Sequence, residues 1–130
     1  MSKTYSFTKE ERLRNKKLID ELFRNGSSFL CYPFKVLWLE QREPQSYPAQ
    51  VLFGVPKKRF KKAVDRNMIR RRMREAYRLN KEQHLYSILN SSNKNIVFSV
   101  GYVGKEIFDY AFIEKKMLKL LTSLAEESVK

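Results

Sequence analysis

Basic side chains gather in one stretch of this 130-residue chain, residues 57–78, which reads KKRFKKAVDRNMIRRRMREAYR. The stretch holds eleven Lys and Arg residues against two acids, so it carries +9 of the total net charge of +13. A dense cationic face on a rigid element binds a polyanion, because each neutralised phosphate releases condensed counterions. The pattern indicates nucleic-acid binding, although composition alone leaves an anionic membrane surface or an acidic protein open as partners.

Within this stretch, residues 63–80 have the periodicity of an amphipathic helix. Its apolar side is formed by Met68, Ile69, Met73, Ala76 and Leu79. Its polar arc is formed by Arg66, Asn67, Arg70, Arg71, Arg74 and Arg78. Four of these arginines repeat every fourth residue, a spacing at which like charges cost roughly a few tenths of a kcal/mol per pair. A helix that only needs to be soluble mixes both signs, so this repulsion indicates a missing polyanion.

More basic residues flank the arc. Arg72 projects toward the apolar side, so it must reach out to solvent or pair with a carboxylate. The strand end and loop before the helix should extend the RNA-binding surface through Lys57, Lys58, Arg59, Lys61 and Lys62. Arginine donates bidentately to phosphate and stacks on bases, and aromatic side chains beside a basic groove suit unstacked strands, so RNA is favoured over DNA.

The residues that could do catalysis are sparse. His84 is the single histidine, it lies in a polar stretch, and no second histidine or glycine-flanked serine accompanies it. The acids occur mostly at helix starts or beside basic residues, and the four glycines are scattered. We therefore expect no catalytic residue and no metal site in the protein alone.

Length and composition fit one folded domain over residues 1–130, with flexible ends at 1–7 and 126–130. The apolar content of 42% is too high for a disordered chain. Cys31 is the only cysteine, so an internal disulfide is excluded. There is no apolar run suited to a signal sequence or a membrane span, so we expect a soluble cytoplasmic protein.

The remaining elements follow from hydrophobic patterning. Thr8 and Glu11 fit a capping box at the start of a helix over residues 9–25, which Gly26 should end in a left-handed cap. A strand is expected over residues 28–40, with Phe34, Val36 and Trp38 on one face and Lys35, Leu37 and Leu39 on the other. Residues 49–55 should pair antiparallel with it.

After the basic helix, residues 84–95 should form a loop, and the apolar run NIVFSVGYV at 95–103 a central strand. A last helix should begin near Asp109 and bury Ile113, Met117, Leu120, Leu121 and Leu124. The order α-β-β-α-β-α, with a further short strand possible, predicts an α+β fold: a two-layer α/β sandwich with one mixed sheet packed with helices. The strand-helix-strand unit around the basic helix fits a parallel crossover, usually right-handed.

These residues together resemble a known family. The run KKRFKKAVDRNMIRRRMREAY is similar to the signature of the bacterial ribonuclease P protein component, in which two lysines close a strand and an Arg-Asn-centred basic helix follows. The segments FTKEERLRNKKLIDELFRNG, YPFKVLW, VLFGVPKK and IVFSVGY stand in the expected order over nearly the whole chain. One departure is Met68, which stands where the family's Arg-Asn-Arg triplet has its second arginine.

The resemblance implies a protein subunit that binds a large catalytic RNA and the 5′ leader of precursor tRNA. The ribonucleoprotein removes the leader by hydrolysing one phosphodiester bond, and the RNA does the chemistry with Mg²⁺ held mainly by RNA partner and substrate. A left-handed crossover is implied, as is a leader cleft between the basic helix and the sheet. Candidate cleft positions are Ile19, Phe23, Phe34, Leu37, Lys57 and Lys58. Phe23 and Phe34 also fit plain core packing, and both interpretations stay open at this point.

Two other functions fit the residues. A ribosomal or RNA-chaperone-type RNA-binding protein, with no role in tRNA processing, could use the same fold and the same basic helix on another RNA. A DNA-binding protein could lay the arginine helix in a major groove.

Overall fold

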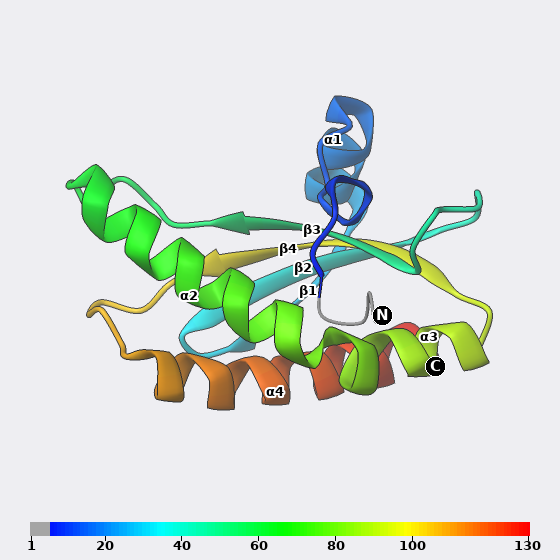
Figure 1. Ribbon diagram of the computed structural model, residues 1–130. Coiled ribbons are helices and arrows are strands. Elements are labelled where there is room, and N and C mark those ends of the chain that lie inside the picture. The colour runs from blue at the N-terminus through cyan, green and yellow to red at the C-terminus, as the bar shows by residue number, and fades with distance from the viewer. Residues whose placement is uncertain (1–5) are drawn as a thin grey trace.

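The structure, a computed structural model, describes residues 6–130 and shows the expected α+β sandwich (Figure 1). In chain order the elements are a 3-10 turn Lys9–Glu11, α1 Lys16–Asn25, β1 Ser27–Cys31, β2 Phe34–Gln41, β3 Ala49–Gly54, α2 Ala63–Lys81, a π-helical turn Glu82–Tyr86, α3 Ser87–Ser91, β4 Asn95–Tyr102 and α4 Tyr110–Ser128. The predicted order holds, and β1 is the further short strand.

The four strands form one mixed sheet in the order β1-β2-β4-β3. The apolar strand β4 is central, antiparallel to β2 and parallel to β3. The predicted parallel crossover through the basic helix is therefore confirmed. The predicted antiparallel pairing of residues 49–55 with the preceding strand is wrong, because β4 lies between β2 and β3. Ile96, Val97 and Phe98 are all buried, so only a place covered on both faces suits this strand.

The single strand expected over residues 28–40 is a hairpin of β1 and β2, with Cys31 opposite Phe34 across the turn. Pro33 lies in that turn and has no N–H to give to a ladder, which explains the interruption. The predicted alternation within β2 is confirmed. Phe34 and Val36 are buried in the main core, whereas Leu37 packs on the other face of the sheet.

Helices cover the two faces of the sheet unequally (Figure 1). Beneath one face, α2 and α4 bury their apolar stripes in the main core, which includes Ile69, Met73, Ala76 and Tyr77 from α2 and all five predicted residues of α4. On the other face α1 packs against the sheet, through Leu22 with Leu18 and Ile19 beside it, and Leu13 of the preceding segment joins the same cluster. Because α1 has only ten residues, part of this second face stays open.

The first helix is shorter than the predicted span of residues 9–25. Glu11 does accept a hydrogen bond from the Thr8 N–H, at 2.7 Å, but the motif closes only a 3-10 turn. The chain then extends beside β3, where the Leu13 N–H donates to Val51 O at 2.9 Å. A second cap starts α1, because Asn15 Oδ1 accepts from the Leu18 N–H at 3.2 Å.

The predicted loop over residues 84–95 is wrong in its first half, because the π-helical turn and α3 occupy residues 82–91. Leu85, Tyr86 and Leu89 are buried there in the main core. The last helix begins as predicted, with Asp109 Oδ1 accepting from the Phe112 N–H at 3.0 Å. It continues to Ser128, which is buried, so residues 126–128 are helical.

At the other end, residues 1–5 of the expected flexible segment lie outside the described residues. Phe7 packs against the rings of Phe53 and Tyr77, with centroids 6.3 and 5.7 Å away. Within residues 6–130, no helix combines the length and the apolar character needed to cross a bilayer.

Gly26 joins α1 to β1, but not through the predicted left-handed cap. Its φ is −72°, an ordinary extended conformation. Glycine is needed for space instead: a Cβ at this position would lie 2.5 Å from Leu22 O and 3.1 Å from Trp38 O. The end of α1 and the backbone of β2 therefore approach each other across a residue with no side chain.

A buried ion pair links the N-terminal segment to the end of α2. Lys81 Nζ donates to Glu11 Oε2 and to Ser6 O, and the Tyr86 hydroxyl donates to the same Glu11 oxygen at 2.6 Å. Burial alone would raise the pKa of Glu11. The hydrogen bonds from Lys81, the Thr8 N–H and Tyr86 outweigh it and hold the pKa below its ordinary value of 4.5. Burial lowers the pKa of Lys81, and Glu11 offsets part of that effect.

Gly26→Ala should destabilise the protein by about 1–3 kcal/mol, because the new methyl group forces α1 and β2 apart. Chemical denaturation measures the difference. Gly54→Ala is the matched control, since nothing lies within 4 Å of a Cβ placed there. Equal stability of the two variants would contradict the close approach at Gly26.

Acid should weaken the fold through Glu11. Its folded-state pKa is depressed, so its contribution is present above the unfolded-state pKa and is lost as the pH falls through the folded-state value. Glu11→Gln cannot lose this contribution on acidification. Urea unfolding at neutral pH and near pH 3 should therefore show a larger loss of stability in the wild type than in the variant. The same loss in both proteins would show that Glu11 does not contribute.

Candidate nucleic-acid interface

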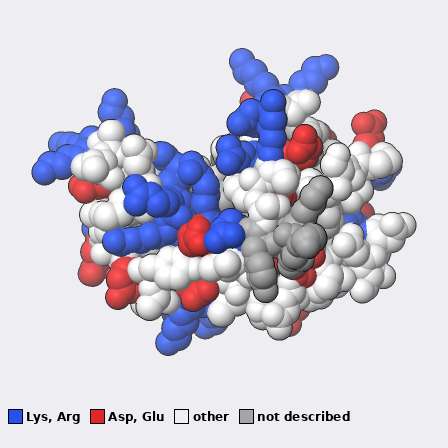
Figure 2. Space-filling view, viewed as in Figure 1, with Lys and Arg blue, Asp and Glu red and all other residues white. Residues whose placement is uncertain are grey.

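The arginine face of α2 points to solvent, as the sequence predicted. Ile69, Met73 and Ala76 are fully buried on the other side of the helix. This leaves the polar arc outward, where Lys and Arg side chains gather over α2 (Figure 2). Asn67, Arg71 and Arg74 are exposed, and Arg66, Arg70 and Arg78 are half-buried.

The six residues of the arc are not equally available to a ligand. Arg66 Nη1 donates to Phe60 O at 2.8 Å and to Lys61 O at 2.9 Å, so this side chain secures the loop before α2. Arg70 Nη1 donates to Asn67 Oδ1 at 2.9 Å. Within the described part of the chain, Arg71 and Arg74 form no ion pair.

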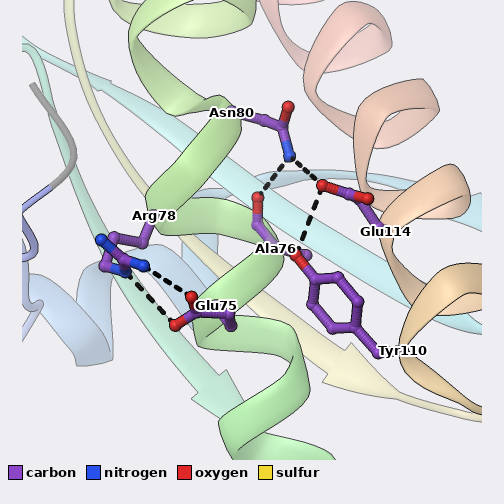
Figure 3. A network of polar contacts seen from close by, with 6 residues as sticks. All are labelled: Glu75, Ala76, Arg78, Asn80, Tyr110 and Glu114. Atoms are coloured by element: carbon purple, nitrogen blue, oxygen red, sulfur yellow. Dashed lines mark hydrogen bonds and ion pairs between the residues drawn. The ribbon is translucent and has the colours of Figure 1, made fainter.

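The C-terminal half of the arc is partly neutralised (Figure 3). Arg78 pairs with Glu75 at 2.5 Å, and this contact lowers the pKa of the carboxyl group. Beside them Asn80 donates to Ala76 O at 2.8 Å and to Glu114 of α4 at 3.1 Å. Glu75 thus compensates the charge of Arg78, so the strongest uncompensated charge is in the middle of α2.

Arg72 and the unusual Met68 act together. Arg72 Nη1 donates to Phe108 O at 2.7 Å, and Nη2 approaches Met68 Sδ at 3.3 Å. The prediction was that Arg72 reaches solvent or pairs with a carboxylate; its partner is instead a backbone carbonyl in the segment that leads into α4. Where the family's triplet carries arginine, Met68 therefore packs against Arg72 and helps attach α2 to the rest of the fold.

The loop between β3 and α2 presents its charges outward. All five of its predicted RNA-binding residues are exposed: Lys57, Lys58, Arg59, Lys61 and Lys62. Phe60 is the exception, because its side chain is buried. The centroid of its ring lies 5.8 Å from that of the Tyr102 ring, and this packing fixes the loop. Together with Arg66 it holds the loop in one conformation, which keeps the basic side chains on the surface next to the start of α2.

A cleft of about 630 Å³ opens on the part of the sheet that α1 leaves uncovered. It is lined by Phe23, Lys35, Leu37, Leu52, Gly54, Val55, Pro56, Ser99, Val100, Gly101, Tyr102 and Val103. Figure 2 shows the surface hollowed between the lobe of α1 and the lobe that carries the start of α2. The walls of this cleft are α1 and the sheet, whereas the leader cleft was predicted between the basic helix and the sheet.

The predicted cleft residues separate into three groups. Phe23, 57% exposed, and Leu37 line the cleft, and Lys57 and Lys58 follow Pro56 at its rim. Ile19 packs between α1 and the sheet.

Phe34 cannot reach the cleft, because it is fully buried on the opposite face of the sheet. Strand alternation puts Phe34 with Val36, and Leu37 on the other side.

Several cleft residues escaped the sequence prediction. Ser99 and Gly101 are the small residues of β4 on the face opposite Phe98 and Val100. Their alternation with large apolar residues was a usable signal, because small side chains on one face of a buried strand leave space above it. Lys35 lies on the same face of β2 as the predicted Leu37 and adds one cation to the lining.

The N-terminal segment also contributes basic residues that the prediction missed. A smaller pocket of about 160 Å³ lies between this segment, β3 and α2, and its lining includes Arg12, Arg14 and Arg74. Burial and the nearby charges of Arg12 and Arg70 lower the pKa of Arg74. Three guanidinium groups from two separate segments therefore face one small space.

Across residues 6–130, no three His, Cys, Asp or Glu side chains are grouped as a metal site. The residues of the cleft suit binding: an exposed aromatic ring can stack on a base, a lysine can contact a phosphate, and the small residues of the sheet leave room for a flat group. The donors present do not fit Mg²⁺, which prefers carboxylate and phosphate oxygens.

Comparison with known proteins agrees with this geometry. The family model described as Ribonuclease P matches residues 7–125. The ribonuclease P protein component of Porphyromonas gingivalis is 34% identical over 122 residues, covering 94% of this chain and 88% of the relative. That of Chlorobium phaeobacteroides is 33% identical, covering 92% and 88%.

Solved structures show the same fold. The ribonuclease P protein of Thermotoga maritima superposes with a TM-score of 0.68 at 27% identity, covering 87% of this chain and 96% of that one. The ribonuclease P protein of Staphylococcus aureus, at 19% identity, matches in fold with a TM-score of 0.67, covering 92% and 99%.

The family model, the relatives and the solved structures all point to the same family. They disfavour the ribosomal and RNA-chaperone alternative. The chain belongs to the ribonuclease P protein family, whose members are subunits of the ribonucleoprotein endoribonuclease that matures the 5′ ends of tRNA.

Proposed function

We propose that this chain binds the ribonuclease P RNA through the arginine face of α2 and holds the single-stranded 5′ leader of precursor tRNA in the cleft between α1 and the sheet. The observation that supports leader binding is the cleft itself, with an exposed Phe23 on the α1 wall and Lys35 on the sheet. A channel with stacking surfaces and few base-reading groups is suited to a strand of any sequence.

The arrangement gives the two RNAs separate surfaces. The cleft lies above one face of the sheet, and α2 packs beneath the other. Exposed basic residues between Pro56 and α2 connect the two surfaces along the chain. A leader in the cleft would leave the arginines of α2 free for the catalytic RNA.

The chemistry in this proposal resides in the RNA, with Mg²⁺ held by the RNA and the substrate. This chain supplies positioning: it neutralises phosphates and fixes the leader relative to the RNA. Its own residues offer phosphate donors and stacking surfaces at the interface. Such a subunit works where precursor tRNA is processed, so the cytoplasm is the compartment we propose.

Reconstitution tests the function directly. The purified protein is added to an in vitro transcribed bacterial ribonuclease P RNA and a precursor tRNA at low Mg²⁺ concentration. We expect stimulated removal of the leader, because bound protein offsets phosphate repulsion that Mg²⁺ otherwise screens. No stimulation with several such RNAs, or leader cleavage by the protein without RNA, would refute the proposal.

Arg71→Ala should weaken binding of ribonuclease P RNA and reduce the slope of log K against log salt by about 0.7–0.9, the value for one phosphate contact. Arg71 is exposed and unpaired within residues 6–130, so its loss should leave stability unchanged. Filter binding over a salt series measures both quantities.

Arg42→Ala is the matched control for that experiment, because it removes one exposed arginine from the loop after β2. Its slope should equal that of the wild type. A common decrease in both variants would mean that net charge, and not contact at α2, sets the salt dependence.

Phe23→Ala should reduce affinity for precursor tRNA with a leader by about 1–3 kcal/mol, the contribution of one base stacked on an aromatic ring. Affinity for mature tRNA, which has no leader, should stay the same. Leu30→Ala is the control, because Leu30 is also exposed and apolar but lies on β1 outside the cleft. An equal loss of affinity for precursor and mature tRNA would show that Phe23 does not contact the leader.

A further inference from the structure

Glu11 and Lys81 form an ion pair deep in the protein, with side chains 0% and 1% exposed. The pair joins the 3-10 turn near the N-terminus to the last residue of α2, 70 positions later. Lys81 also holds Ser6 O, and its ammonium lies 5.7 Å from the centre of the Phe7 ring. One buried cation therefore contacts three residues of the N-terminal segment.

The residues that follow Glu11 carry two arginines along β3. Leu13 is buried and bonded to Val51 O at 2.9 Å, so the side chains on either side of it are held at the surface. Arg12 lies over the Phe7 ring, with its guanidinium carbon 5.2 Å from the ring centre. Arg12, Arg14 and Arg74 line the same small pocket, which brings the N-terminal segment to the middle of the α2 arginine face.

Holding these three cations together is unfavourable in the free protein. The proximity of Arg12 is one reason that the pKa of Arg74 is lowered. Within residues 6–130 none of the three forms an ion pair, and residues 1–5 contain no acid that could supply one. A buried ion pair thus holds like charges next to each other, and such a cluster of cations is suited to a ligand that carries several phosphates.

We propose that Glu11 and Lys81 are positioning residues for RNA binding: their buried pair holds Arg12 and Arg14 beside Arg74, so that the RNA surface of α2 extends across the N-terminal segment. The proposal rests on the proposed binding of ribonuclease P RNA. Lys81 itself touches no RNA, because it is buried.

Glu11→Gln separates positioning from simple electrostatics by the sign of its effect. The substitution removes a negative charge near the arginines, so electrostatics alone predicts tighter RNA binding. Loss of positioning predicts the opposite. We expect several-fold weaker binding of a bacterial ribonuclease P RNA, and a salt slope lower by about 1–2 units, corresponding to one or two lost phosphate contacts.

A second variant separates positioning from folding. Glu11→Gln alone leaves the Lys81 ammonium buried without a counter-charge, which destabilises the fold. Glu11→Gln/Lys81→Met removes both charges and should recover thermal stability, while RNA binding stays weak because nothing anchors the turn. Recovery of wild-type affinity and slope together with stability would overturn the proposal.

Two controls complete the test. Leu124→Ala, a cavity in the core side of α4, should lower stability and leave the salt slope of the still-folded protein unchanged. In an Arg12→Gln/Arg14→Gln background, Glu11→Gln should cause no further loss of RNA affinity, and an additive loss would count against the proposal. If the wild type binds no ribonuclease P RNA, the proposed function fails; if it binds and Glu11→Gln binds as well or better, only this inference fails.

Discussion

The burial of β4 on both faces is the constraint on which the rest of this structure depends. Its apolar run requires helices beneath the sheet and a cover above it. The lower cover is complete, with α2 and α4 side by side. The upper cover is α1 with Leu13 of the segment before it, which reaches Val97 but leaves Ser99 and Gly101 open. The cleft is thus the remainder of an incompletely covered sheet, and the small residues of β4 occur where no helix packs.

The same constraint orients the basic helix. Because the apolar stripe of α2 must face the main core, its arginines can only face outward. The structure then assigns them different tasks. Arg66 near the start of α2 and Arg72 at its middle donate to backbone carbonyls of neighbouring segments, and Arg78 is paired with Glu75. A run of like residues in the sequence therefore contains both structural and ligand-facing arginines, and the charges available to RNA are fewer than the sequence count.

Sequence patterning predicted the elements whose signals are local and strong. The period and charge of α2, the apolar run of β4 and the Asp109 cap each have one structural solution, and all three are confirmed. Thr8 and Glu11 misled because a capping box can close a short 3-10 turn as well as start a helix. The helical turns after α2 were missed because their apolar run, residues 85–89, is short and lies between polar stretches on both sides.

Non-local features were beyond the sequence alone. Which strand borders β3, and which face of β2 stays open, depend on how segments far apart in the chain pack. Alternation put Phe34 and Leu37 on opposite faces, but it could not say which of the two faces the cleft. Arg12 and Arg14 become candidate RNA-binding residues only because they lie beside Arg74. We propose above that the buried Glu11–Lys81 pair, which joins positions 70 residues apart, holds them there.

The glycines of the cleft have an evolutionary consequence. A methyl group at position 54 would touch nothing within 4 Å, and at position 101 it would meet only Lys35 O at 3.8 Å. Neither residue has positive φ. Single substitutions at these positions can therefore narrow or reshape the cleft without disturbing the core, so the leader preference of the proposed site can change between relatives while the scaffold stays the same.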